Sequence, residues 1–353
     1  MLSTATLSNA VNRPQVVVNF PNYFGTRSSM GVFFKDLYDA LVQNGVEVFT
    51  ACLNAPAEIP LKSYITPTRA KHKLMRYLSY YWQLSTFMRK NSGAVLLNIS
   101  QEFAFTPCPS RTVTIIHDLI QLRYPRTWWI RSYVGLMLRF IRRSRLNIAV
   151  SATTQARLRQ HGIQSTVLYN WFGIDGASAS ETTTPKLYDG LFVGNQFPHK
   201  NISMFLRLAR RFPAHKFAAI VPKMAQPEIC TFGPLPNLTI FSDLAQDNYL
   251  QAIAQSRTLV SPSLDEGFGR PPMEASLAGV NLLLSDIPIY RELYSELALF
   301  FSLDDEEDLA AKFVDLISGR IAAPAGKEHL RKQVINAHRG DPQQYVQAIL
   351  ANS

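Results

Sequence analysis

One stretch, residues 258–292, constrains the fold more than any other; it has the sequence TLVSPSLDEGFGRPPMEASLAGVNLLLSDIPIYRE. It begins with a short apolar run of β type, continues into a polar loop with two glycines, and enters a helix at Pro271 and Pro272. Proline suits a first helical turn because the N–H that it lacks would have no partner there. Gly279 is a typical helix-ending residue, and a second apolar run follows at residues 282–284. A strand–loop–helix–strand unit of this length predicts a right-handed crossover between parallel strands.

The loop of this unit has the chemistry of an anion and sugar site. Gly267 and Gly269 allow backbone N–H groups to approach a ligand closely, and the N-terminus of the helix behind them favours a phosphate. Glu266 stands in the loop, where it can face the reacting end of a ligand. Glu274, eight positions later in the first helical turn, can accept hydrogen bonds from ribose or sugar hydroxyls. The alternative is a pair of turn glycines with two solvated carboxylates.

Two other predicted strands end in polar residues. The strand at residues 112–116 runs into His117 and Asp118, and the strand at residues 190–193 precedes the loop GNQFPHKN, which contains Lys200. The carboxyl ends of strands are where ligands bind in open α/β sheets. A lysine in such a loop can act as a point charge on departing phosphate oxygens. The alternatives are a structural histidine, an aspartate that caps a turn and a solvated lysine.

Chain length and element order predict two domains. Both halves have a βαβ rhythm, which favours an α/β fold with two Rossmann-like sheets. Residues 173–186 are small and polar without periodicity, as a linker would be. We therefore predict a first domain over residues 1–172 and a second over residues 187–341.

The excess of basic over acidic residues is confined to the first half of the chain. Residues 1–185 hold 20 Lys and Arg against 8 Asp and Glu, whereas residues 186–353 hold 16 against 18. Nucleic acid, an anionic membrane or an acidic substrate could each be the partner of such a surface. Residues 69–90 and 123–145 combine aromatic and basic side chains, as interfacial helices do. We expect the second of these stretches to face the core, and the first to meet a membrane or a lipid-linked acceptor.

Three widely spaced cysteines without a CxxC pair argue against a disulfide framework or a zinc site and favour a reducing compartment. The first residues lack the pattern of a signal peptide, and no apolar run is long enough to span a bilayer. We therefore predict a cytoplasmic protein. The acidic run at residues 304–308 is interpreted as the first turn of a helix, whose dipole it favours, and not as a metal site.

Beyond these physical arguments, the run EGFGRPPMEA, with the AG and SD that follow it, resembles the E-x7-E motif of the family 4 retaining glycosyltransferases. The segments HDL and RYP at residues 117–125 and the loop GNQFPHKN also resemble this family. The resemblance covers most of residues 15–340 and is strongest over 190–292. It implies the GT-B fold, in which two Rossmann-like domains face an interdomain cleft and a last helix, here residues 342–353, returns to the first domain.

The resemblance implies a role for each candidate residue. Lys200 would neutralise the donor diphosphate, Glu274 would hold the ribose, and His117 would reach the sugar from the first domain. Glu266 would hold or polarise the sugar, so Glu266, His117 and Lys200 are the catalytic candidates. The further donor-binding candidates are Gly31, Asn195, Gly267, Phe268, Gly269 and Arg270. This chain has Asn195 where the family often has arginine, which makes Arg270 the candidate second cation for the diphosphate.

The resulting functional prediction is a retaining, metal-independent glycosyltransferase without a cofactor. It would move a hexose, which we predict to be mannose, from a nucleotide diphospho-sugar to a glycan or polyprenyl-diphosphate-linked acceptor in bacterial surface polysaccharide synthesis, such as that of lipopolysaccharide. Peripheral attachment to the inner face of the plasma membrane would explain the basic first domain. The alternatives are a nucleotide-sugar epimerase or phosphorylase of the same fold, and a non-catalytic protein whose basic half binds nucleic acid.

Overall fold

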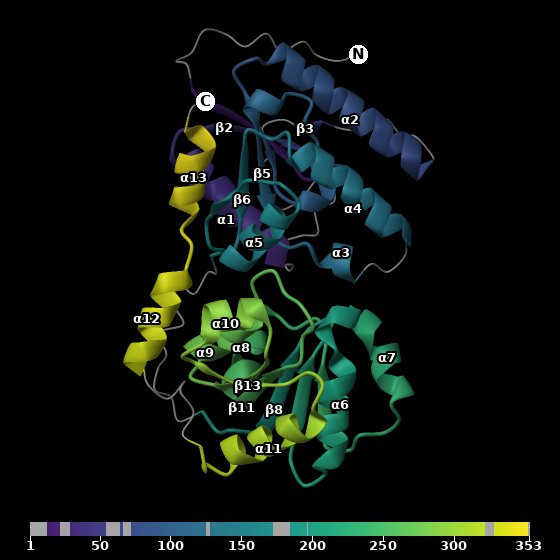
Figure 1. The fold of residues 1–353 in the computed structure, drawn as a ribbon, viewed down its shortest axis with the longest axis vertical. Coiled ribbons are helices and arrows are strands. Elements are labelled where there is room, and N and C mark those ends of the chain that lie inside the picture. Colours follow the sequence, from purple (N-terminus) through teal and green to yellow (C-terminus); the bar gives the residue numbers. More distant parts are fainter. Residues whose placement is uncertain are drawn as a thin grey trace.

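The computed structural model describes residues 13–21, 29–53, 64–65, 72–124, 128–171, 184–195, 197–321 and 328–351 of the 353-residue chain. Two parallel sheets, each with helices packed around it, lie one beyond the other along the long axis of the molecule (Figure 1). The predicted α/β architecture with two Rossmann-like sheets is confirmed.

The first sheet has seven parallel strands in the order β3-β2-β1-β4-β5-β6-β7. Its strands are β1 (Gln15–Asn19), β2 (Glu47–Ala51), β3 (Tyr64–Ile65), β4 (Val95–Asn98), β5 (Thr112–Ile116), β6 (Leu146–Ala149) and β7 (Thr166–Val167). The helices of this half are α1 (Ser29–Gln43), α2 (Lys73–Lys90), α3 (Ile120–Arg123), α4 (Trp128–Ile141) and α5 (Ala152–Gln160), with short 3₁₀ turns η1 (Gln101–Phe103) and η2 (Pro109–Arg111). The central strands are almost wholly buried, as expected of a parallel sheet that is covered on both faces.

The second sheet has six parallel strands in the order β10-β9-β8-β11-β12-β13. Its strands are β8 (Tyr188–Val193), β9 (Phe217–Ile220), β10 (Leu238–Phe241), β11 (Ser256–Ser261), β12 (Asn281–Ser285) and β13 (Ala298–Phe301). Its helices are α6 (Ile202–Arg211), α7 (Gln226–Thr231), α8 (Gln246–Ala254), α9 (Arg270–Leu277), α10 (Pro288–Tyr294) and α11 (Glu306–Ile317), with 3₁₀ turns η3 (Pro198–Lys200) and η4 (Lys223–Ala225). In both sheets the strand order reverses beside the first strand, which creates the switch point where α/β proteins bind ligands.

The structure adds elements that the sequence did not predict. They include β3, α3, α7, α10 and β13, of which α10 contributes to the site described below. Helix α1 begins at Ser29, so Gly31 lies in its first turn. Residues 173–183 of the predicted linker lie outside the described residues.

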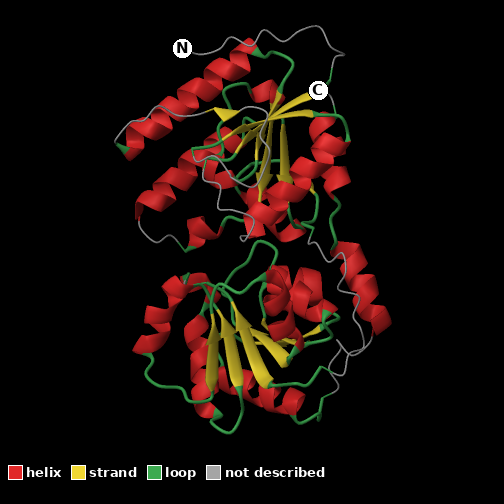
Figure 2. Cartoon of the chain, turned by 180° about the vertical axis from the view of Figure 1, so that it is seen from behind, coloured by secondary structure: helices red, strands yellow, loops and turns green. Residues whose placement is uncertain are grey.

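The end of the chain crosses between the two halves (Figures 1 and 2). Helix α12 (Glu328–His338) contacts α9 and α10, whereas α13 (Pro342–Leu350) contacts α1 and β4. Gly340, between these helices, donates its N–H to the carbonyl of Asn170 at 3.0 Å. A Cβ at this glycine would stand 1.7 Å from the carbonyl oxygen of Tyr169, so only glycine permits the approach.

An aromatic cluster fixes α13 to the first half of the chain. Tyr345 is fully buried, its ring lies edge-on to Trp171 with centroids 4.8 Å apart, and its hydroxyl donates to the carbonyl of Leu168 at 2.5 Å. Trp171 in turn stacks on Phe33 of α1 with centroids 4.0 Å apart. These side chains belong to the largest buried apolar cluster, which also includes Phe268 and Tyr290 from the second half. The two halves therefore share one continuous core.

Replacing Tyr345 by alanine should remove this anchor. Truncation of a buried aromatic side chain costs about 3–5 kcal/mol of unfolding free energy. The matched variant Tyr345→Phe loses only the hydroxyl and should cost about 1 kcal/mol. Urea unfolding followed by circular dichroism measures both. An alanine variant that unfolds at the wild-type urea concentration would show that α13 contributes nothing to the first half.

Candidate functional site

Two loops of the second half lie side by side at the carboxyl ends of the adjacent strands β8 and β11. The backbone N–H of Leu264, in the loop after β11, donates to the carbonyl of His199, in the loop after β8, at 2.7 Å. Just beyond these two residues, the Lys200 ammonium lies 2.5 Å from a carboxylate oxygen of Glu266. The predicted phosphate-loop lysine and the first glutamate of the motif therefore form a direct ion pair.

Glu266 is held from several sides. The same oxygen, Oε1, that meets Lys200 also accepts hydrogen bonds from the hydroxyls of Ser263 at 2.8 Å and Tyr290 at 3.4 Å. The glutamate is 7% exposed, and the Lys200 side chain is 14% exposed. Breaking a buried pair by removing one partner is strongly destabilising because the other charge is left uncompensated. Both charges are thus fixed at the end of the sheet.

The loop glycines are required by close packing. A Cβ on Gly267 would lie 2.0 Å from the carbonyl oxygen of His117, which belongs to the first half of the chain. Gly269 has φ +77°, a left-handed conformation that favours glycine, and a Cβ there would lie 2.8 Å from the ring of Tyr290. The hydroxyl of Tyr294 donates to the Gly269 carbonyl at 2.6 Å. Through Gly267 the carboxyl end of β11 meets that of β5, so the two sheets face each other here.

His117 is a neutral side chain in this position. Its Nε2 lies 3.0 Å from the carbonyl oxygen of Ile99, which can only accept, so Nε2 carries the proton and Nδ1 is left as an acceptor. The pKa of the His117 imidazole is lowered to about 4, because burial lowers it more than the hydrogen bond to the Ile99 carbonyl raises it. The ring edge also packs against Phe33. His117 can therefore accept a hydrogen bond from a hydroxyl, but it supplies no positive charge near neutral pH.

Asp118 faces the same region. The pKa of its carboxyl group is raised to about 6, mainly by burial and also by the negative charges of Asp265 and Glu266, while the N–H of Ile120 and the Lys200 charge oppose this. Its Oδ1 accepts the backbone N–H of Ile120 at 3.0 Å, which is the turn-capping alternative that the sequence left open. A small cavity beside Asp118 is lined by Gln101, Glu102 and Gln121 and by apolar side chains of α4. Burial also raises the pKa of Glu102, to about 7.

Glu274 forms a second polar cluster on α9. Its Oε1 accepts from Arg270 Nη2 at 3.2 Å, and its Oε2 accepts from the hydroxyl of Tyr249 on α8. Burial raises the pKa of Glu274, and the Arg270 charge partly offsets this. Because α9 begins at Arg270, Pro271 and Pro272 occupy the next positions and offer no N–H to an anion. The guanidinium of Arg270, more than the first turn of the helix, is therefore the group here that can donate hydrogen bonds to an anion.

The structure therefore joins Lys200, Glu266, Gly267 and His117, and it separately joins Arg270 with Glu274. Gly269 borders the first group through Tyr290, which it packs against and which donates to Glu266. Asn195 accepts the backbone N–H of Phe197 at 3.1 Å, Phe268 is 5% exposed within the apolar core, and Gly31 lies on α1.

Sequence reasoning missed the side chains that support the site. Tyr249 and Tyr290 come from α8 and α10, and Arg157 comes from α5 in the other half of the chain. One signal could have revealed α10: Pro288 closely follows Ser285 and Asp286, which is typical of a helix start. No local pattern points from Arg157 to the glycine loop, because the two meet only in the folded chain.

The acidic run near residue 305 has a structural use. Asp305 caps α11 by accepting the N–H groups of Glu307 and Asp308, and Glu306 and Glu307 pair with arginines of α6. Within the described part of the chain, no group of three or more His, Cys, Asp or Glu side chains could hold a metal ion. Metal independence stays a prediction. The three cysteines are free.

The sequence matches two family models that together cover most of the chain. Residues 30–175 match the model described as Glycosyltransferase Family 4, and residues 178–340 match the model described as Glycosyl transferases group 1. The chain belongs to the family 4 glycosyltransferases, and the predicted activity class is confirmed.

One relative is similar over much of the chain, and another over a short segment. The O-antigen chain mannosyltransferase RfbU of Salmonella typhimurium LT2 is 27% identical over 258 residues, which cover 69% of this chain and 71% of RfbU. The serotype-specific mannosyltransferase WbdA of Escherichia coli is 30% identical over 76 residues, which cover 22% of this chain and 9% of WbdA.

Solved structures confirm the GT-B fold. The structure of WaaG, a glycosyltransferase involved in lipopolysaccharide biosynthesis, matches with a TM-score of 0.73 at 13% identity over 96% of this chain and 100% of WaaG. Anabaena HepE in complex with UDP-glucose matches with a TM-score of 0.72 at 14% identity over 96% of this chain and 100% of HepE.

Replacing Gly267 by alanine should separate the two halves of the site. The added Cβ overlaps the His117 carbonyl, so the loop and β5 must move apart, and a misplacement of about 1 Å can cost about 100-fold in rate. Transfer activity and small-angle X-ray scattering measure the two effects. The matched control is Gly135→Ala on α4, where a Cβ meets nothing within 4 Å. Wild-type activity and compactness in the Gly267 variant would contradict the close contact.

Proposed function

We propose that the protein is a retaining, metal-independent glycosyltransferase that moves a hexose from a nucleotide diphospho-sugar to a glycan or polyprenyl-diphosphate-linked acceptor. The observation that carries this proposal is the buried Lys200–Glu266 pair, which stands at the ends of two adjacent parallel strands and opposite His117. Such a strand-end position is where α/β proteins bind nucleotides. An anionic diphosphate entering here meets the Lys200 charge, with the Arg270 guanidinium on the next helix.

The reaction proposed for this site is same-face substitution at the anomeric carbon. The bond between that carbon and the diphosphate oxygen breaks, the acceptor oxygen forms the new bond on the same face, and the acceptor proton passes to the departing phosphate oxygen. The charge of Lys200 stabilises the leaving diphosphate. Glu266 and the acceptor nitrogen of His117 hold sugar hydroxyls, and the remaining effect is positioning. Glu274 holds the ribose.

The acceptor is proposed to enter from the first half of the chain. Asp118 borders the cavity beside α4 and is electrostatically coupled to Glu266 and Lys200. The polar side chains around this small cavity, Gln101, Glu102 and Gln121, suit hydrogen bonds to acceptor hydroxyls.

Mannose is the proposed sugar because RfbU and WbdA are both named mannosyltransferases. A nucleotide-linked donor is favoured because the related HepE structure holds UDP-glucose. A role in surface polysaccharide synthesis is favoured because RfbU is described as an O-antigen chain mannosyltransferase and WaaG as involved in lipopolysaccharide biosynthesis.

A membrane surface is the proposed docking partner of α2. Leu74, Leu78 and Trp82 recur at four-residue intervals on one side of this helix, and each is more than half exposed. Tyr80, Leu84 and Met88 recur on another side and are buried in the first domain. The helix carries basic residues and no acidic ones: Lys73, Arg76, Arg89 and Lys90. An apolar stripe with flanking bases fits an anionic bilayer surface.

Among the helices that the structure describes, none has the length and apolar character required to cross a bilayer. The proposed attachment is peripheral, with α2 lying in the interface at the inner face of the plasma membrane.

A thermal-shift panel of nucleoside diphosphates and nucleotide sugars tests the donor site. A ligand that binds only the folded state raises the melting temperature, so at least one member should stabilise the protein, by several degrees at saturation. Glu274→Ala should abolish transfer while the circular dichroism spectrum stays that of the wild type. An active Glu274→Ala variant would remove its assigned role, and a panel without any stabilising member would remove the donor site.

Flotation with vesicles tests the membrane surface. The wild type should bind phosphatidylglycerol vesicles more tightly than phosphatidylcholine vesicles and should be released by 0.5–1 M salt, roughly the range in which screening shortens to a few ångströms. The triple variant Leu74→Ser, Leu78→Ser, Trp82→Ser should lose at least about tenfold in binding, since it removes most of the apolar stripe. The control is Met224→Ser, an equally exposed apolar residue of the second half. Equal binding by both variants would rule out α2.

A further inference from the structure

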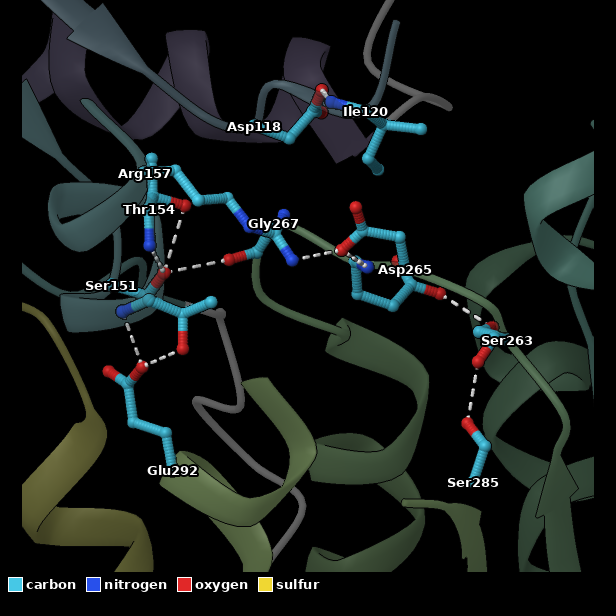
Figure 3. Close-up of polar contacts among 12 residues, drawn as sticks. Asp118, Ile120, Ser151, Thr154, Arg157, Ser263, Asp265, Gly267, Ser285 and Glu292 are labelled. Atoms are coloured by element: carbon cyan, nitrogen blue, oxygen red, sulfur yellow. Dashed lines mark hydrogen bonds and ion pairs between the residues drawn. The ribbon is translucent and has the colours of Figure 1, made fainter. Parts of the chain in front are cut away.

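The N-terminus of helix α5, in the first half, contacts the second half of the chain (Figure 3). Ser151, which caps this helix, accepts the N–H of Thr154 at 3.1 Å and donates its hydroxyl proton to the carbonyl of Gly267 at 3.0 Å. The cap of one domain thus contacts the glycine loop of the other directly.

The second half caps the same helix in return. The carboxylate of Glu292, on α10, accepts the backbone N–H groups of Ala152 and Thr153, each at 2.7 Å, and the hydroxyl of Thr153 at 2.6 Å. The first N–H groups of a helix have no partner within it, so they need an external acceptor. Because that acceptor belongs to the other domain, α5 is held in one orientation against the site (Figure 3).

One turn further along α5, Arg157 reaches the loop itself. Its Nη2 lies 2.6 Å from Oδ1 of Asp265, and the same oxygen accepts the backbone N–H of Glu266 at 2.8 Å. Asp265 is 2% exposed. Burial raises the pKa of Asp265, and the Arg157 charge opposes this, with a smaller contribution from Arg123. Arg157 therefore favours the ionised carboxylate that can hold the Glu266 backbone.

We propose that Arg157 is a positioning residue for the transfer reaction. From the first domain it holds Asp265, and through Asp265 it holds the backbone of Glu266, whose side chain pairs with Lys200. The loop thereby takes its reactive geometry only while the two domains are in contact. The inference rests on the proposed donor site at Lys200 and Glu266.

This arrangement separates two tasks. The described groups proposed to hold the nucleotide, Lys200, Arg270 and Glu274, all lie in the second half, so nucleotide binding does not require Arg157. The orientation of Glu266 toward the sugar does require it. Loss of Arg157 should therefore lower the rate of transfer far more than the affinity for a nucleoside diphosphate.

The test compares Arg157→Gln and Arg157→Lys with the control Arg159→Gln, which changes an exposed arginine of the same helix. Steady-state transfer gives kcat and KM for the donor, and thermal shift gives the affinity for the nucleoside diphosphate that the wild type binds. Arg157→Gln should lower kcat by about 10- to 100-fold, as expected of a misplaced reacting group. Its nucleotide affinity should stay within about twofold of the wild type. Arg157→Lys should recover part of kcat because it keeps the charge, and Arg159→Gln should match the wild type.

A double-mutant cycle completes the test. If Arg157 acts through Asp265, adding Asp265→Asn to Arg157→Gln should cause little further loss in kcat. Losses that multiply, or an Arg157→Gln variant with the kcat of the Arg159→Gln control, would overturn the inference. Equal losses of kcat and nucleotide affinity would also overturn it, because they indicate general damage to the fold. A wild type that transfers sugar but binds no nucleoside diphosphate would instead overturn the proposed donor site.

Discussion

The contact between Gly267 and the His117 carbonyl is the constraint on which the rest of the site depends. It brings the carboxyl end of β11 against that of β5 with no room for a side chain between them. Two further contacts hold the halves together. The Ser151 hydroxyl donates a hydrogen bond to the Gly267 carbonyl. The segment before α13 requires a second glycine, Gly340, to approach the Tyr169 carbonyl. The two sheets therefore meet at this point by backbone packing, and the candidate reactive groups stand around it.

The acidic residues of the motif are all paired, and each has a partner from a different source. Asp265 pairs with Arg157 of the other domain, Glu266 with Lys200 of the neighbouring loop, and Glu274 with Arg270 of its own helix. Buried ion pairs contribute little net stability, because desolvation offsets much of the attraction. Their value here is orientation. In the proposed function, an incoming diphosphate, itself anionic, would compete with Glu266 and Glu274 for the same cations, so donor binding would be coupled to rearrangement of these pairs.

The sequence predicted those parts of the fold and site that local patterns encode. Strand β5 has the predicted bounds, residues 112–116, because an apolar run marks it, and β8 begins two residues before the predicted range of residues 190–193. Glu266, Glu274, Lys200 and His117 stood out because each follows a strand or opens a helix in a recognisable motif. The supporting residues did not, since Tyr249, Tyr290 and Arg157 reach the loop by tertiary packing from elements distant in sequence or in the other domain. Helix α10 has only seven residues, too few for a clear helical periodicity in the sequence.

The most direct test of the central claim, that Lys200 beside Glu266 marks the diphosphate site, is calorimetric titration with ADP, GDP and UDP. At least one of them should bind the wild type, and Lys200→Ala should weaken that nucleotide at least about tenfold, or about 1.4 kcal/mol. Lys90→Ala, which removes a lysine from the far end of α2, should leave the affinity unchanged. Undiminished binding by Lys200→Ala, or no binding of any nucleoside diphosphate by the wild type, would contradict the account.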